Sequence, residues 1–183
     1  MNTVVTSKED ILRHSRELIR RQGWAAVNIR SVAAACGVSV GSIYNYFDSK
    51  TELTAATVES IWQEIFPFPP EGAFAGTLAC IEWIYQRIGY GCRRYPGIYA
   101  LHSFAFGPEK AEGRQRMQRA WTQMEERLGA VLRQDPRVRP HAFDGAFTAE
   151  AFAAALFALI LAALLREDDD PTAVLEIVRR TVY

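Results

Sequence analysis

The sequence is poor in cysteine and lacks a secretion signal. Its three cysteines, Cys36, Cys80 and Cys92, include no CxxC pair and cannot close a set of disulfides, so reduced thiols are expected. The amino end, MNTVVTSKED, lacks the basic and then apolar plan of a signal peptide. Both absences favour a cytoplasmic protein.

Long apolar runs and catalytic motifs are also missing. The longest apolar run, Ala151–Leu165, has fifteen residues, whereas a membrane-spanning helix needs roughly 20, so the run predicts a buried helix. The histidines do not stand at metal-ligand spacing from cysteines or carboxylates. No nucleophile–base pair and no phosphate-binding loop is present. We therefore expect a protein that is not an enzyme and that has neither a cofactor nor a metal.

The chain lacks a net charge, because 21 basic residues balance 21 acidic ones. The balance is uneven along the sequence. Residues 1–47 contain six basic and three acidic residues, a net charge of +3, and the remainder has a net charge of −3. A mildly basic amino end on a neutral protein indicates an anionic partner for that end.

Proline is absent before Pro67 and then occurs three times within the segment FPFPPEG, which predicts a boundary between two modules. Apolar residues recur at helical spacing on both sides of it, and no segment alternates like a strand. The prediction is an all-α fold of about nine helices. We expect a three-helix helix-turn-helix module over residues 1–53 and a helical domain over residues 67–183. A fourth helix over residues 49–66 connects the two.

Residues 29–47 have the build of the helix-turn-helix motif itself. A helix of eight residues is followed by a tight turn at Gly37 and by a second short helix that Ser39 can cap. Ile43 and Phe47 would hold the second helix against the first. The residues expected to face outward, where hydroxyl and amide groups could reach phosphates or base edges, are Val40, Gly41, Ser42, Asn45 and Tyr46.

The stretch NIRSVAAACGVSVGSIYNYFDSKTEL, residues 28–53, resembles the DNA-binding signature of the TetR family of transcriptional regulators. The resemblance covers about residues 8–55 and implies that Val40–Phe47 is the recognition helix. It places Tyr44, Tyr46 and Lys50 at phosphate-contacting positions. It places a further group at positions that touch bases or backbone: Arg30, Ser39, Val40, Gly41, Ser42 and Asn45. Asn28 stands where threonine is usual, with a helix-capping and phosphate-binding role.

Some of these residues also have simpler interpretations. Tyr44 could pack its ring in the core of the small module and offer only its hydroxyl outward. Arg30 could pair with a local carboxylate instead of DNA. Cys92 precedes two arginines, which favour a thiolate, but it also continues an apolar helical stripe.

The carboxy-terminal part is rich in large aromatic residues, which are common in the walls of small-molecule sites. The candidate ligand-binding residues are Trp83, Arg87, Tyr99, His102, Phe106 and Trp121. The alternative is that these side chains fill the helical core. The apolar segment 148–166 is expected to pack against a second copy of the chain, beside the stripe Val174, Ile177, Val178 and Val182. The alternative is that this segment is the central helix of the monomer core.

The resemblance implies a ligand-responsive regulator of transcription that works as a homodimer. We expect a repressor that is released from a palindromic operator in double-stranded DNA by a small apolar or aromatic effector, with no role for a membrane. An activator, or a regulator that needs no ligand, is the alternative. A cysteine-based redox sensor is a further one.

Overall fold

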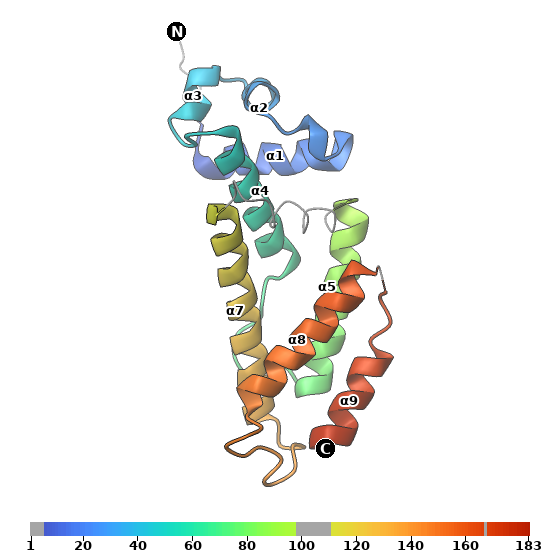
Figure 1. Cartoon of the computed structure of the whole chain (residues 1–183). Helices are drawn as coiled ribbons and strands as arrows, with labels where there is room; N and C mark the ends of the chain where they lie inside the picture. Colours follow the sequence, from blue (N-terminus) through green and yellow to red (C-terminus); the bar gives the residue numbers. More distant parts are fainter. Residues whose placement is uncertain (1–5, 98–110, 167) are drawn as a thin grey trace. The chain divides into compact units, whose positions relative to one another are not determined.

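The computed structural model describes residues 6–97, 111–166 and 168–183 (Figure 1). Within these ranges the chain forms eight α-helices and one short 3₁₀-helix, with no strand. The elements are α1 (Lys8–Gln22), the 3₁₀-helix (Trp24–Ala26), α2 (Ile29–Cys36), α3 (Val40–Tyr44), α4 (Lys50–Ile65), α5 (Thr77–Arg94), α7 (Ala111–Gln134), α8 (Ala149–Leu165) and α9 (Thr172–Val182). The predicted all-α class is confirmed. The almost wholly apolar segment 98–106 lies outside the described residues.

The described residues group into two compact units. Unit 1 contains the described residues within 1–65 and 91–117, and unit 2 contains those within 66–90 and 118–183. Helices α5 and α7 each contribute residues to both units.

The helices of unit 1 begin at polar residues that cap them. Each cap accepts a hydrogen bond from a backbone N–H two or three residues further on, which satisfies a donor that the first helical turn leaves unpaired. The caps are Ser7, Asn28, Ser39 and Ser49. The end of α2 is also determined by a local feature. Gly37 adopts φ +68°, a conformation that suits glycine, and turns the chain toward α3.

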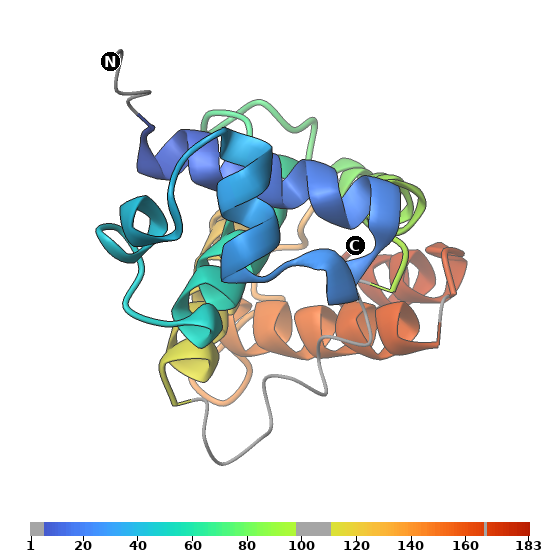
Figure 2. The ribbon, with the colours of Figure 1, turned by 90° about the horizontal axis from the view of Figure 1, so that it is seen from above.

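Helices α1 to α4 enclose the core of unit 1, and Figure 2 shows α2 lying across α1. The core residues are fully buried and include Ile11, Val32, Ile43, Phe47 and Leu53. Cys36, in the last turn of α2, is only half-buried. Helix α3 ends at Tyr44 and not at Phe47 as the sequence suggested, because the backbone N–H groups of Tyr46 and Phe47 both donate to the carbonyl of Ile43 and close the helix in a turn.

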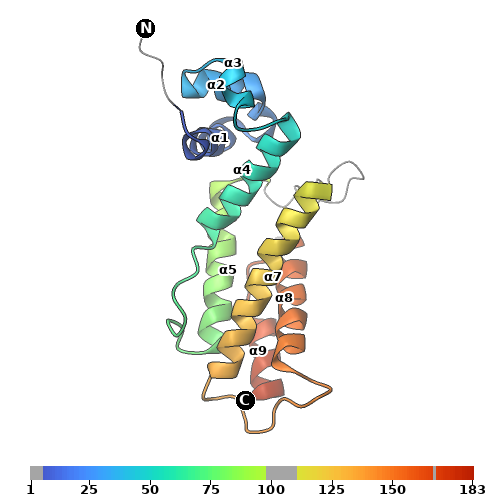
Figure 3. The same cartoon turned by 90° about the vertical axis from the view of Figure 1, so that its left-hand side faces the viewer.

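Unit 2 packs parts of α5 and α7 with α8 and α9 (Figure 3). The Trp121 ring meets Phe157 with ring centroids 6.4 Å apart, so α7 and α8 lie side by side. The core of the unit is apolar and includes Ile81, Ile84, Leu128, Leu132, Leu156 and Val178.

A buried carboxylate, Asp135, ties the ends of several elements of unit 2 together. It accepts hydrogen bonds from the backbone N–H of Thr77 at 2.6 Å, from the Nε of Arg137 at 3.2 Å and from the hydroxyl of Tyr183. Burial alone would raise the pKa of Asp135, but the hydrogen bonds from Tyr183 and Thr77 outweigh it and hold the pKa well below its usual range. Asp135 therefore stays ionised and anchors the start of α5 and the end of the chain.

The exposed surface of unit 2 differs from the expectation for α9. Val174, Val178 and Val182 are buried inside the unit, whereas Ile177 is 37% exposed. On α8 the exposed face is made of small apolar residues and two leucines: Ala151, Ala154, Ala155, Ala158, Leu159, Ala162 and Leu165. None of the described helices is both long and apolar enough to cross a membrane.

Candidate nucleic-acid interface

The helix-turn-helix of unit 1 is built by local hydrogen bonds. The Oδ1 of Asn28 accepts from the backbone N–H groups of Arg30 and Ser31 at 3.1 and 3.0 Å, and the Oγ of Ser31 accepts from the backbone N–H of Asn28 at 3.2 Å. This reciprocal capping box fixes the start of α2. The oxygen of Asn28 is thereby engaged within the chain, as the predicted capping role requires.

Helix α3 presents its side chains to opposite sides. Ile43 and the following Phe47 are fully buried and hold the helix against unit 1. Val40, Tyr44 and Tyr46 are 41%, 50% and 38% exposed. Gly41 and Asn45 are also exposed, and Ser42 is half-buried. The ring of Tyr44 is therefore not core, and α3 offers a mixed apolar and polar face to a partner.

Some polar groups on this face already have partners within the chain. The Oγ of Ser39 accepts from the backbone N–H of Ser42 at 3.1 Å and lies 2.9 Å from the Oγ of Ser42. The hydroxyl of Tyr46 donates to the backbone carbonyl of Thr6 at 2.6 Å. Since a phenol has one proton, Tyr46 could donate to a phosphate only by giving up this bond. The sequence pattern contains no sign of it, because the two residues are 40 positions apart.

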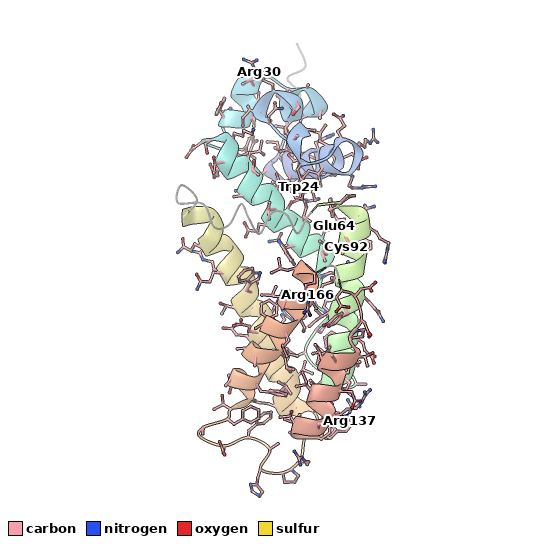
Figure 4. The ribbon with its side chains drawn as sticks, turned by 45° about the vertical axis from the view of Figure 1, so that its right-hand side comes forward. Trp24, Arg30, Glu64, Cys92, Arg137 and Arg166 are labelled. Atoms are coloured by element: carbon pink, nitrogen blue, oxygen red, sulfur yellow. The ribbon has the colours of Figure 1, made fainter. Side chains whose placement is uncertain are left out.

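The cations at the edge of this face are available to a partner. Arg30, in the first turn of α2, is exposed and makes no ion pair with any residue that the structure describes (Figure 4). Lys50, the first residue of α4, is also exposed and unpaired within the described ranges. The alternative that Arg30 pairs with a local carboxylate is therefore not seen among the described residues. Both cations suit an anion such as a phosphate.

The lack of a side chain at Gly41 has no explanation inside the chain. A Cβ built there would meet only the Oγ of Ser39, at an ordinary 3.7 Å, and the backbone does not need a positive φ. Glycine also weakens a helix relative to alanine. The open position beside Val40 and Ser42 permits a bulky partner to approach the backbone of α3.

The predicted ligand-binding residues are only partly within the described ranges. Tyr99, His102 and Phe106 lie outside them. Trp83 packs in an aromatic cluster with Phe66, Phe68 and Phe74, at ring-centroid distances of 6.1, 4.8 and 5.5 Å respectively. Arg87 lies over the ring of Tyr90 at 4.4 Å. Trp121 packs instead against Phe157, so Trp83 and Trp121 have different ring neighbours among the described residues.

Two of the three cysteines have a raised thiol pKa, and the described residues show no cluster of metal ligands. Burial raises the pKa of the Cys80 thiol to about 12 and raises that of Cys36 as well, which disfavours their thiolates. In the part of the chain that the structure describes, no three histidine, cysteine or acidic side chains gather where they could hold a metal ion.

The amino-terminal part of the chain matches a known protein family. Residues 11–57 match the family described as bacterial regulatory proteins, tetR family, and these residues contain the whole helix-turn-helix. The chain carries a TetR-family DNA-binding domain. The resemblance suggested by residues 28–53 is confirmed, and the TetR-family domain extends from α1 into α4.

Part of the chain is similar to curated proteins that are named as HTH-type transcriptional regulators. An uncharacterised HTH-type transcriptional regulator in the lacX 3′ region of Lactococcus lactis is 30% identical over 98 residues, which are 47% of this chain and 50% of that protein. The chain thus matches only half the length of this relative.

Solved structures share the fold over nearly the full length. A TetR-family regulator from Rhodococcus has a TM-score of 0.67 at 16% identity, covering 96% of this chain and 97% of that one. SmeT, the repressor of the Stenotrophomonas maltophilia multidrug efflux pump SmeDEF, has a TM-score of 0.64 at 17% identity, covering 98% and 92%. At these identities the likeness shows a common TetR-type fold.

Proposed function

We propose that the chain is a transcriptional repressor that binds a palindromic operator as a homodimer and is released by a small apolar or aromatic effector. The observation that carries the proposal is the exposed face of α3, on a TetR-family helix-turn-helix whose inner face is fully buried. A helix held in this way can enter the major groove of double-stranded DNA.

The residues of this face divide between two kinds of contact. Tyr44, Lys50 and Arg30 supply a hydroxyl and two cations for phosphates, which position the protein on the duplex. Val40, Gly41, Ser42 and Asn45 present the apolar, open and amide surfaces that would meet base edges. Asn28, Ser39 and Tyr46 support this arrangement through the internal hydrogen bonds described above, and any phosphate contact of theirs comes in addition.

The exposed face of α8 supports the homodimer. Its alanines leave room for a second helix to pack closely, and Leu159 and Leu165 supply larger apolar surface, being 41% and 53% exposed. An apolar face of this kind is costly to leave in water. A symmetric dimer would cover it with the same face of the partner, and it would match two recognition helices to two half-sites.

The effector part of the proposal rests on the aromatic residues of the carboxy-terminal part. Trp121 is half-buried in α7, and Arg87 and Trp83 lie along α5, where they could contribute to a site for an aromatic molecule. Tyr99, His102 and Phe106 complete the proposed set. SmeT, which shares the fold, is the repressor of a multidrug efflux pump, which is in keeping with repression relieved by organic compounds.

Selection of bound duplexes from random oligonucleotides tests the DNA-binding proposal. We expect enrichment of an inverted repeat, followed by a gel shift at nanomolar protein. The double variant Tyr44→Ala/Lys50→Ala should lose the shift, whereas Arg180→Ala, which removes an exposed cation from α9, should keep it. Failure of the folded wild-type chain to enrich any sequence would contradict the proposal.

A further inference from the structure

Glu64, near the end of α4, joins three helices of unit 1 through one carboxylate. Its Oε1 accepts from the Nε of Arg94 at 3.0 Å, and its Oε2 accepts from the hydroxyl of Tyr95 at 2.9 Å. The same Oε2 forms an ion pair with the Nε of Arg16 in α1 at 3.2 Å. We call Glu64, Arg16, Arg94 and Tyr95 the α5 clasp.

The α5 clasp is partly shielded from water. The side chains of Glu64 and Arg16 are 29% and 16% exposed, and Tyr95 is fully buried. Burial and the bond to Glu64 raise the pKa of Tyr95, so its hydroxyl keeps its proton. Burial would raise the pKa of Glu64, but the bonds from Tyr95 and Arg94 outweigh it and lower that pKa. Charge-assisted bonds in such a setting hold more strongly than exposed surface pairs.

Two neighbouring contacts fasten the same stretch of chain to unit 1. The indole Nε1 of Trp24 donates to the backbone carbonyl of Pro96 at 3.1 Å, and Figure 4 shows Trp24 and Glu64 beside the end of α5. Gly91 lets α5 approach α4 closely, because a Cβ at this position would lie 2.7 Å from the Cδ1 of Ile65. Residues 91–97 are therefore held by α1, α4 and the 3₁₀-helix.

Helix α5 thus belongs to two units, since residues 77–90 lie in unit 2 and its last turn lies in unit 1. We propose that Glu64 is a positioning residue for DNA binding, which fastens the last turn of α5 to the DNA-binding helices so that DNA binding and the state of α5 depend on each other. This inference rests on the proposed function. It identifies where the carboxy-terminal part of the chain would act on the helix-turn-helix.

Hydrogen exchange of the full chain without DNA tests the clasp itself. Glu64→Gln should raise the exchange rates of the amides of residues 91–95 roughly tenfold, because a hydrogen bond to a charged group is lost. Tyr95→Phe, which removes only a hydroxyl, should give a smaller increase in the same amides. The matched control is Glu176→Gln, which removes a carboxylate paired with Arg179 and Arg180 within α9 and should leave residues 91–95 unchanged. Unchanged rates in both clasp variants would overturn the inference.

The same measurement on the complex with a selected operator tests the dependence on DNA. In the wild type and in Glu176→Gln, DNA should slow exchange both in residues 28–47 and in residues 91–95. In Glu64→Gln and Tyr95→Phe the protection of 28–47 should remain, and that of 91–95 should be reduced at least threefold. Equal DNA-dependent protection of 91–95 in the wild type and both clasp variants would overturn the coupling. Absence of protection at 28–47 in the wild type would instead refute the proposed function, while the DNA-free rates still decide the clasp.

Discussion

Gly41 and Gly91 are both helical glycines with ordinary backbone angles, but packing inside the chain requires only the second of this pair. Gly41→Ala should therefore raise the free energy of unfolding by up to about 1 kcal/mol, since alanine favours a helix. It should also weaken operator binding by about tenfold or more, the effect of a lost base contact. Thermal unfolding and gel shift measure the two effects separately.

Gly91→Ala is the control for this prediction. It should lower the free energy of unfolding by about 1–3 kcal/mol, because the new methyl group would overlap Ile65. If Gly41→Ala left operator affinity unchanged, α3 would not approach DNA at that position.

The exposed isopropyl group of Val40 is suited to contact the methyl group of a thymine in the major groove. Replacing each thymine of a selected half-site by uracil removes that methyl group alone. We expect one position at which uracil weakens wild-type binding by about threefold to tenfold, in line with the burial of one methyl group. In Val40→Ala, titration of the same duplexes should show no difference at that position. Equal sensitivity of the two proteins to uracil would contradict the contact.

Lys50 has the simplest expected role, because it is an exposed cation without an ion pair among the described residues. Lys50→Ala should weaken binding to all DNA sequences alike and reduce the salt dependence of the logarithm of affinity by about one unit. Lys50→Arg keeps the charge and should keep the slope. If Lys50→Ala, measured between low and moderate salt, kept the salt dependence of the wild type, Lys50 would not contact a phosphate.

At the scale of elements, the helix starts of unit 1 could be predicted because their signals are local. Ser7, Asn28, Ser39 and Ser49 each bond to a backbone group two or three residues away, so a short stretch of sequence contains both partners. The orientation of α9 was harder to predict. Its apolar stripe was expected to face a partner subunit, but most of it faces the core of unit 2, and periodicity alone does not distinguish two apolar environments.

In the candidate site too, some features could be predicted from local sequence and others depend on how the helices pack. The outward face of α3 followed from the spacing of Ile43 and Phe47, whose burial fixes which side is exposed. The hydrogen bond from Tyr46 to Thr6 joins residues 40 positions apart. The bonds from Arg94 and Tyr95 to Glu64 span 30 and 31 positions. Neither contact leaves a periodic pattern in the sequence. Hydrogen bonds of this kind appear only once the helices are placed in three dimensions.

Helix α8 offers a sharp contrast between adjacent residues. Leu159 is 41% exposed and Ile160 is 1% exposed. Leu159→Glu should therefore yield a folded monomer, because the charge would lie in the proposed dimer interface. Ile160→Glu should unfold unit 2, since a buried unpaired charge is strongly destabilising. Sedimentation and circular dichroism of both variants test the pair, and a dimeric Leu159→Glu protein would exclude this face as the interface.

At the scale of the whole molecule, the proposed release from the operator requires an effector that favours the form that does not bind DNA. A preference of ~100-fold corresponds to about 2.7 kcal/mol of coupling. An effector found by thermal-shift screening of aromatic compounds should then bind about 100-fold more weakly in the presence of saturating operator, because coupling is reciprocal. Calorimetric titration with and without operator measures this factor. Equal affinities would show that the compound does not act as an inducer.

The four tryptophans are divided evenly between the two units, with Trp24 and Trp62 in unit 1 and Trp83 and Trp121 in unit 2. Trp24 donates its indole N–H to Pro96 beside the α5 clasp, whereas Trp83 lies within a cluster of phenylalanine rings. One variant that keeps only Trp24 and another that keeps only Trp83 would therefore report separately, by fluorescence, on the two units. The emission of Trp24 would follow the last turn of α5, and that of Trp83 would follow unit 2, so the order in which the two units respond to a ligand could be timed by stopped-flow fluorescence.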